Sequence, residues 1–386
     1  MPVPPPAEGT ALTTPPDAAE VAFMTRGFVS AVAPDGGLRP MQRLLLEAVS
    51  DAMTGFPMDH DPEPITPRAY AEGLARRDMG FRARMVQVML LAELVLSPLP
   101  EEVADRVTAF ASELGVDDEM LRVTREFAHG SLGLAAVDFA RNGYVPDLDA
   151  RVAALGRRPG PDDDPWGAVA ADPALAARWA ALEDLPAGTL GHQVWRFYRA
   201  RGFTYPGTPG SAPPLLAQHD WVHVLADYGT TVESELEVFA LISRANDDPR
   251  AFSLLAMVVS LFETGYLASG AGLFQADRGH LSHAGVAVRL ADGLRRGALC
   301  TDTRSGESSI DFLAIDWFSL ADRPVEVVRT ELGMVPRSEA ARAAGSVGPW
   351  EPGGISPFQL AAGQAMAAAE GRPYDPYGAA VGDPAG

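Results

Sequence analysis

The hydrophobic residues of the N-terminal half recur at helical spacing, and the alternation typical of β-strands is nearly absent. Leu45, Val49 and Met53, for example, fall on one face of a predicted helix over residues 41–53. Further helices are predicted over residues 67–77, 81–96, 100–114 and 117–139. Gly115 follows the third of these, at the position where a helix-ending glycine is expected. The pattern therefore predicts an all-α fold made of helical bundle domains.

The C-terminal half shows the same helical signature. Thr189 is a predicted N-cap for a helix whose apolar face carries Phe197 and Tyr198. A helix is also predicted over residues 215–228, which contain neither proline nor glycine. A weaker helical pattern covers residues 358–370.

Composition suggests where the domains begin and end. The first residues are rich in Pro, Thr and Ala, and three consecutive aspartates lie in a Pro- and Gly-rich stretch near the middle of the chain. We therefore predict a disordered tail over 1–20, an N-terminal helical domain over 21–150, a linker over 151–175, a second helical domain over 176–337 and a low-complexity tail over 338–386.

Charge narrows the possible functions. The chain has 31 basic and 51 acidic residues, a net charge of −20, and no lysine. The absence of lysine excludes Schiff-base chemistry at a lysine and a P-loop lysine. The acidic balance argues against nucleic-acid binding and against polybasic attachment to an anionic membrane.

The single cysteine and the apolar stretches give further bounds. Cys300 stands alone, which excludes an internal disulfide and any CxxC site. The N-terminus lacks the pattern of a signal peptide, so we expect a cytoplasmic protein. The most apolar stretch, residues 252–274, is interrupted by Glu263 and by glycines, and we expect it to form a buried pair of helices.

The densest candidate chemistry lies in the predicted helix over 215–228. His219 and His223 are four residues apart, so their side chains project from one face of the helix. Two imidazoles in this relation can bind one divalent metal ion. The alternative is a helix with ordinary surface histidines, since the pattern also arises by chance.

Gly229 suggests how a third ligand reaches the histidines. On one unbroken helix Glu235 would lie about 18 Å along the axis from His223, too far to share a metal. We expect Gly229 to end the helix and Thr230 to cap the next one, with Glu233 completing a capping box. His223 and Glu235 are each six residues from Gly229, so an antiparallel hairpin brings them face to face.

Asp220 is the fourth candidate in this metal site on a helical hairpin. Its carboxylate is a predicted ligand, an orienting partner for a histidine, or the catalytic acceptor of a proton from metal-bound water. Two histidines with one or two carboxylates suit Zn²⁺, Fe²⁺, Mn²⁺ or Co²⁺. Asp227 is a weaker competitor as a ligand, and we expect Glu237 to face solvent.

The remaining histidines and a group of arginines carry no predicted function. Surface or structural roles are expected for His60, His129, His192, His280 and His283. A solvated face is expected for Arg289, Arg295 and Arg296.

The motif resembles the signature of the coenzyme Q (ubiquinone) biosynthesis protein 4 family. That signature is HDxxH, eleven residues and Glu, which here runs from His219 through Asp220 and His223 to Glu235. LPAGTLG at 185–191 and the stretch from Asp316 to Met334 are similar to two other parts of the family pattern, in the same order. The resemblance covers about residues 176–335. The N-terminal domain lies outside it and only loosely resembles the tellurite-resistance TerB-like helical domain.

The resemblance implies an all-helical fold and a divalent metal held by the four motif residues. It also implies an apolar groove for a prenylated quinone precursor, peripheral attachment to the inner face of the cytoplasmic membrane, and contact with other quinone-biosynthesis proteins. A homodimer is a further expectation. The implied reaction is oxidative decarboxylation of a prenylated aromatic ring, in which a hydroxyl replaces a carboxylate.

Two other functions fit the same residues. A non-catalytic scaffold that binds a prenyl lipid and assembles quinone-biosynthesis enzymes would keep the apolar groove, with a structural metal or none. A metallohydrolase is the third reading, because HDxxH is similar to HExxH, although Asp220 has a shorter reach than the usual glutamate base.

Overall fold

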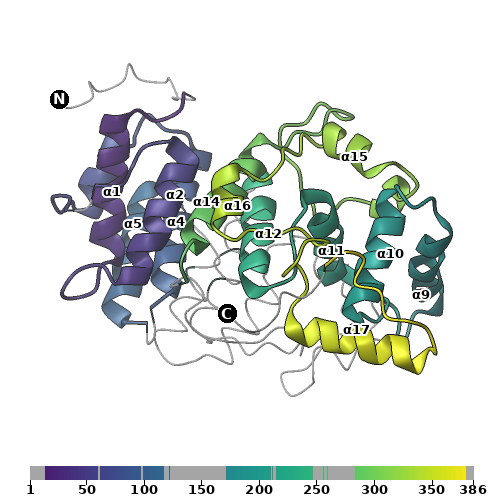
Figure 1. Cartoon of the computed structure of the whole chain (residues 1–386). Helices are drawn as coiled ribbons and strands as arrows, with labels where there is room; N and C mark the ends of the chain where they lie inside the picture. Colours follow the sequence, from purple (N-terminus) through teal and green to yellow (C-terminus); the bar gives the residue numbers. More distant parts are fainter. Residues whose placement is uncertain are drawn as a thin grey trace. The chain divides into compact units, whose positions relative to one another are not determined.

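The computed structural model describes two compact helical units. The described residues are 14–59, 61–96, 99–116, 121, 171–209, 211, 214–246, 255, 259 and 283–379. Residues 14–116 and 283–295 belong to the first unit, and residues 171–246 and 296–379 to the second. Within these ranges the regular elements are helices, and β-pairing is limited to isolated bridges (Figure 1). The predicted all-α fold is therefore confirmed. The predicted tail over 1–20 lies mostly outside the described residues, although a helix begins within it.

The first unit is a helical bundle centred on α4. Its helices are α1 (Ala18–Val32), α2 (Pro40–Thr54), α3 (Pro67–Gly73), α4 (Met79–Leu94) and α5 (Glu101–Leu114). Helix α4 is buried along most of its length because α1, α2 and α5 all pack against it (Figure 1). The four predicted helices that fall in this range are confirmed, and the one predicted over 117–139 lies outside the described residues.

Local sequence signals explain where these helices begin and end. The carboxylates of Asp17 and Asp78 accept hydrogen bonds from backbone amides in the first turns of α1 and α4. Gly115 ends α5 with φ of 71°, a left-handed conformation that glycine adopts without steric cost. The predicted stop at this glycine is confirmed.

The second unit carries the predicted metal hairpin. It contains α9 (Pro173–Ala180), η1 (Ala181–Asp184), α10 (Leu190–Arg201), α11 (Pro214–Ala226), α12 (Val232–Ala245), the end of α14 (Val286–Leu299), η4 (Trp317–Leu320), α15 (Val325–Glu331), α16 (Glu339–Ala343) and α17 (Pro357–Ala369). Helix α10 packs against both α11 and α17 (Figure 1). Thr189 caps α10 as predicted, and Phe197 and Tyr198 are buried on its inner face.

An aromatic cluster packs against α11 around Trp221. The Trp221 ring lies 5.5 Å from Trp179 and stacks on Trp317 at 6.0 Å, centroid to centroid. All three side chains are buried. Large rings of this kind bury much apolar area and fix the orientation of the helix that carries them.

The C-terminal residues are folded up to residue 379. Composition assigns 338–386 to a low-complexity tail, yet α16 and α17 form within it, and α17 matches the helical pattern predicted over 358–370. Ser356 and Gln359 form a capping box at the start of α17. The composition reflects an Ala-rich helix that packs on α10, with Gly- and Pro-rich turns that contact the turn after α11.

The predicted apolar helix pair over 252–274 lies outside the described residues, apart from Leu255 and Val259. Both of those side chains are buried. In the described part of the chain, no helix has the length and the apolar character needed to span a membrane.

Candidate metal centre

The predicted helical hairpin is present, but its turn differs from the prediction. Helix α11 ends at Ala226, and Asp227 follows with φ of 61°, so this aspartate and not Gly229 adopts the left-handed conformation that ends the helix. Thr231, not Thr230, is the N-cap of α12, and its hydroxyl accepts from the amide of Ser234. The predicted capping box with Glu233 is therefore wrong.

Gly229 is required in the turn for a steric reason. Its amide donates to the carbonyl of Val347 at 2.8 Å. A Cβ atom on Gly229 would lie 2.8 Å from the Cα of Gly354, closer than real Cβ contacts allow. The backbone of the C-terminal segment thus packs directly on the turn between the two helices.

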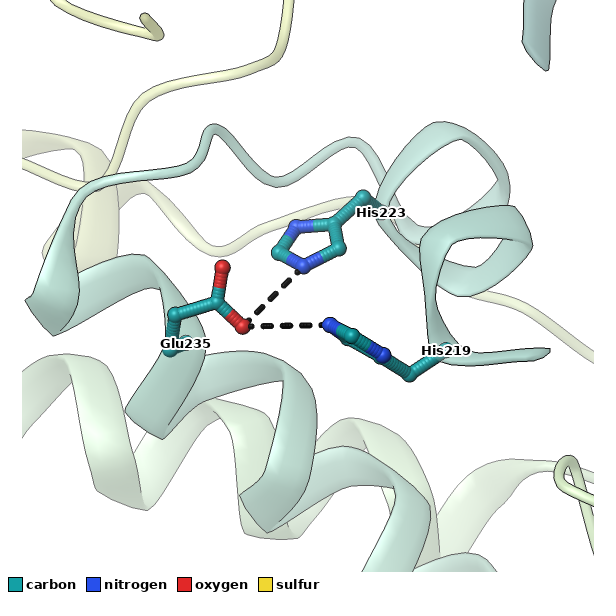
Figure 2. A group of neighbouring side chains, drawn as sticks. All are labelled: His219, His223 and Glu235. Carbon is teal, nitrogen blue, oxygen red and sulfur yellow. Dashed lines mark hydrogen bonds and ion pairs between the residues drawn. The ribbon is translucent and has the colours of Figure 1, made fainter. Parts of the chain in front are cut away.

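Three side chains converge at the hairpin (Figure 2). The Oε2 atom of Glu235 lies 3.2 Å from Nε2 of His223 and 3.5 Å from Nε2 of His219. All three candidate ligand atoms lie within 4.8 Å of one another. The exposed fractions are 3% for His219, 0% for His223 and 1% for Glu235. The equal spacing of His223 and Glu235 about Gly229 correctly predicts this juxtaposition.

The surroundings of His223 favour a cation at its Nε2 atom. Nδ1 of His223 lies 2.8 Å from the carbonyl oxygen of Gly229, which can only accept, so Nδ1 carries a proton. In a neutral imidazole, Nε2 would then present a lone pair to the carboxylate of Glu235. Two acceptors facing each other at 3.2 Å require a proton or a metal ion between them. A histidine fixed by a carbonyl at one nitrogen is a common arrangement at metal sites.

Stacked aromatic rings hold both imidazoles in place. The His219 ring stacks on Phe239 at 5.2 Å, and the His223 ring stacks on Phe197 at 5.5 Å, centroid to centroid. These contacts restrict the rotation of both rings. The ligand atoms are therefore preorganised by packing as well as by hydrogen bonds.

Glu235 is ionised at neutral pH. Burial alone raises the pKa of this carboxyl, but the nearby charges of His223 and His219 and their hydrogen bonds outweigh that cost and lower the pKa to about 2. The carboxylate is thus the charged form that a divalent cation requires.

Asp220 lies beside the cluster but outside the group of three. Its Oδ1 atom is 3.6 Å from Nε2 of His219, while its Oδ2 atom accepts a hydrogen bond of 2.6 Å from the hydroxyl of Tyr198. Burial raises the pKa of Asp220, and the charge of His219 and the Tyr198 hydrogen bond act in the opposite direction. One carboxylate oxygen is therefore occupied by Tyr198, and the other faces the histidine.

Sequence reasoning missed Tyr198 as part of the site. The helical pattern assigns it to the apolar face of α10, and its ring is indeed buried. A buried tyrosine hydroxyl, however, normally has a hydrogen-bond partner, and here that partner is Asp220. The spacing between α10 and α11 in sequence gave no sign of this contact.

The other candidate residues lie apart from the three ligand atoms. Asp227 pairs with Arg337 at 2.6 Å. Glu237, expected to face solvent, is buried, and Arg289 and Arg296 are buried as well, so these predictions are wrong. His192 is half-buried beside the carbonyl of Glu183, and His283 is exposed. The other three histidines without a predicted function, His60, His129 and His280, lie outside the described residues.

No family model, curated protein or solved structure matches the chain. The resemblance to the ubiquinone biosynthesis family therefore stays a prediction. The chemical character of the site follows from its own geometry. Two imidazole nitrogens and one carboxylate oxygen suit Zn²⁺, Fe²⁺, Mn²⁺ or Co²⁺, and a three-ligand set leaves positions for other ligands.

Proposed function

We propose that this chain is a metal-dependent protein of ubiquinone or other prenyl-quinone biosynthesis. Its metal is held by His219, His223 and Glu235. The reaction is oxidative decarboxylation of a prenylated aromatic ring, in which a hydroxyl replaces a carboxylate. The carboxylate leaves as carbon dioxide, and dioxygen from solution is the oxidant that accepts the two electrons. The metal supplies a Lewis-acidic centre for the substrate carboxylate.

One observation carries the proposal: three buried ligand atoms from two helices lie within 4.8 Å of one another. Burying His and Glu side chains costs free energy, because they lose their contact with water. Apolar side chains at these positions would often stabilise the fold as well or better, so the buried group indicates a function. The pathway rests on the sequence motif that contains these residues, together with the two other stretches that resemble the same family.

The chain's own residues supply orientation and a proton site beside the metal. The Gly229 carbonyl fixes the His223 ring, and Phe239 fixes the His219 ring. Tyr198 holds Oδ2 of Asp220, which leaves Oδ1 facing the cluster at 3.6 Å from His219. Asp220 is thereby placed to take up a proton within the buried site.

Metal analysis of the purified full chain tests the binding step. Wild-type protein should hold close to one equivalent of a divalent metal, and the His223→Ala and Glu235→Ala variants should hold almost none. A His192→Ala variant is the matched control, since His192 lies apart from the three ligand atoms. Wild-type protein without stoichiometric metal would refute the proposal.

Quinone analysis tests the reaction. In a bacterial strain whose own copy of the gene is deleted, wild-type protein should restore prenyl-quinone content. Variants at Glu235 should instead accumulate a precursor that keeps its ring carboxylate. Normal quinone content with the metal-free variants would exclude a catalytic role for the metal.

That last outcome would favour a second candidate, a scaffold protein with a structural metal. The observation behind it is the depth of the site, since no ligand is more than 3% exposed. Structural metal sites are typically closed in this way, whereas catalytic sites keep a position open. In the scaffold reading, loss of the metal lowers the stability of the protein, but strains that carry the metal-free variants do not accumulate the carboxylated precursor.

A further inference from the structure

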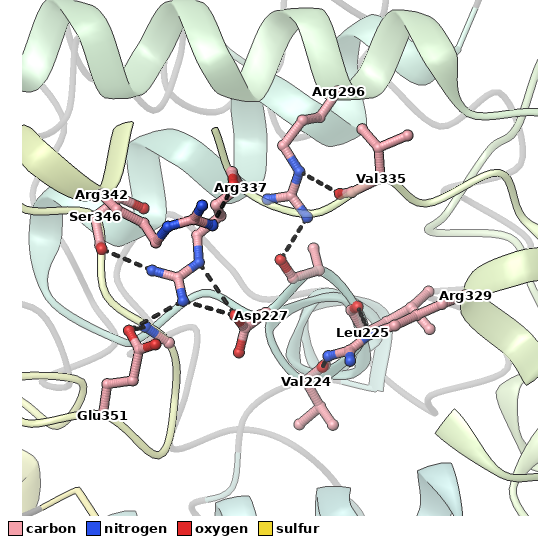
Figure 3. A network of polar contacts seen from close by, with 12 residues as sticks. Val224, Leu225, Asp227, Arg296, Arg329, Val335, Arg337, Arg342, Ser346 and Glu351 are labelled. Atoms are coloured by element: carbon pink, nitrogen blue, oxygen red, sulfur yellow. Dashed lines mark hydrogen bonds and ion pairs between the residues drawn. The ribbon is translucent and has the colours of Figure 1, made fainter. Parts of the chain in front are cut away.

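Two arginines donate hydrogen bonds to the C-terminal end of α11, the helix that carries both histidines (Figure 3). Arg329 donates from Nε to the Leu225 carbonyl at 2.7 Å and from Nη2 to the Val224 carbonyl at 3.1 Å. Arg296 donates from Nη2 to the Ala226 carbonyl at 2.6 Å. The last carbonyls of a helix lack partners within it and carry partial negative charge, so both cations are well placed.

Arg337 holds the residue that ends α11. Its Nη2 atom lies 2.6 Å from Oδ2 of Asp227 and 3.0 Å from Oε2 of Glu351, and its Nη1 atom donates to the Ser346 carbonyl at 2.6 Å (Figure 3). Asp227 adopts φ of 61°, which costs a non-glycine residue on the order of 1 kcal/mol. The pairing with a buried arginine offsets that cost and ties the turn to the C-terminal segment.

Arg201 connects the same C-terminal segment to Thr230, another residue of the turn. It is fully buried on α10, and its Nη2 atom donates to the carbonyls of Pro349 and Gly354 at 3.0 and 2.9 Å. Its Nε atom donates to the hydroxyl of Thr230 at 2.9 Å, and that hydroxyl in turn donates to Gln359. Burial lowers the pKa of Arg201 to about 9, which leaves it protonated at neutral pH.

Gly229, the residue that orients His223, lies between Asp227 and Thr230, which Arg337 and Arg201 contact. The Gly229 amide donates to Val347 at 2.8 Å, and the Thr230 amide donates to Gly354 at 3.0 Å. The carbonyl between these two amides accepts from Nδ1 of His223. Any shift of the C-terminal segment would therefore move the carbonyl that fixes the imidazole.

We infer that Arg201, Thr230, Arg337 and residues 346–359 form a C-terminal clamp that positions His223 for metal binding. The inference rests on the proposed metal site, and its members act through Gly229 without being ligands themselves. The clamp holds the carbonyl against Nδ1, keeps Nε2 directed at Glu235, and so raises metal affinity. Partners of this kind typically change metal affinity by about 10- to 100-fold.

Thr230 offers the cleanest test because one variant removes its hydroxyl and another keeps it. Thr230→Val keeps the shape of the side chain and removes the hydroxyl between Arg201 and Gln359, whereas Thr230→Ser keeps the hydroxyl. The inference predicts that Thr230→Val lowers Co²⁺ affinity about 10- to 100-fold and alters the visible spectrum of bound Co²⁺. Thr230→Ser should restore both properties.

Gly354→Ala is an independent second variant, since a Cβ atom there would lie 2.0 Å from the Gly348 carbonyl and force the segment off the turn. Gly188→Ala is its matched control, because nothing lies within 4 Å of the added Cβ atom. Co²⁺ titration and spectra are recorded for each full-length variant, with circular dichroism as a check of folding. Gly354→Ala should lose affinity and Gly188→Ala should match wild type.

The outcomes separate two failures. If wild-type protein binds no stoichiometric Co²⁺, the metal site itself is wrong and the inference falls with it. If wild type binds Co²⁺ and Thr230→Val binds it with unchanged affinity and spectrum, the metal site stands and the clamp inference is overturned. A lower melting temperature with an unchanged spectrum would likewise overturn it, because it would show a purely structural role.

Discussion

Two fully buried glutamates, one in each unit, have opposite surroundings. Glu235 on α12 is 1% exposed and lies against two imidazoles. Glu93 on α4 is 0% exposed, and neither of its carboxylate oxygens has a hydrogen-bond partner among the described residues. The pKa of Glu235 is lowered to about 2, whereas burial raises the pKa of Glu93 well above its ordinary value and the charge of Arg106 only partly opposes this.

The comparison shows that burial of an acid does not by itself make a site. Burial favours the protonated form of Glu93, and a protonated acid is a poor metal ligand. Glu235 is a carboxylate because its neighbours supply positive charge and donors. Convergence of groups that stabilise the charged form is the feature that separates a candidate metal centre from a tolerated polar residue.

The same substitution at both acids should give the largest difference. Glu235→Gln removes the charged ligand, and metal affinity should fall by more than about 100-fold, since even a residue that only supports a ligand contributes up to that much. Glu93→Gln changes an acid that lies apart from the three ligand atoms and should leave metal content unchanged. Titration with Zn²⁺ and elemental analysis of both proteins check this. Equal metal content in the two variants would remove the distinction between the acids.

Metal should stabilise the second unit of wild-type protein. A divalent ion at about 100 times its dissociation constant should raise the free energy of unfolding by about 2.7 kcal/mol. Every tryptophan lies in sequence ranges that belong to this unit, so tryptophan fluorescence during urea unfolding follows it selectively. Glu235→Gln should show no such gain. A similar gain in that variant would place the metal elsewhere.

Much of the fold and the contact at Glu235 could be predicted from the sequence, because helical periodicity is a local signal. Helical spacing predicts α2 to α5, α10 and α11, and the equal distances of His223 and Glu235 from Gly229 predict their contact. The prediction that Gly229 ends the helix is wrong, because a left-handed conformation is uncommon for a non-glycine residue such as Asp227. In that conformation Asp227 pairs with Arg337, which lies 110 residues away in sequence.

The role of the arginines could not be predicted for a similar reason. Arginine is usually solvated, and its burial here depends on carbonyls and carboxylates supplied by distant segments. Arg201 and Arg296 sit in helices whose patterns give no sign of the C-terminal residues they bind. The low-complexity composition of residues 338–379 likewise hides their contacts with α10 and with the turn after α11.

The two acids should also give opposite pH dependence. Between its unfolded value near 4.5 and its raised folded pKa, Glu93 binds a proton only in the folded state, so its contribution to stability falls as pH rises. The slope is up to about 1.4 kcal/mol per pH unit, and Glu93→Gln should abolish it. In metal-free protein, Glu235 contributes stability above pH 4.5 that is lost as pH falls toward 2. Urea unfolding followed by circular dichroism at several pH values measures both slopes. Equal slopes in wild type and Glu93→Gln would contradict the expected contribution of Glu93.

Tyr198→Phe should have the smallest effect on metal affinity, because Tyr198 acts on the cluster only through Asp220. Tyr198→Phe removes the hydroxyl that donates to Oδ2 of Asp220 at 2.6 Å and leaves a buried carboxylate oxygen without its donor. The expected cost is about 1–3 kcal/mol in unfolding free energy. Metal affinity should fall by no more than about 10-fold, the lower end of the range for residues that orient a ligand's neighbour.

Tyr205→Phe is the matched control for this variant. The Tyr205 ring stacks on Tyr198 at 5.9 Å, but its hydroxyl interacts with Arg199 instead of Asp220. If Tyr198→Phe and Tyr205→Phe lose equal stability, the effect arises from aromatic packing. If only Tyr198→Phe weakens metal binding, and Asp220→Asn in the Tyr198→Phe background adds little further loss, then the tyrosine acts by holding the aspartate beside His219, because coupled residues give non-additive effects.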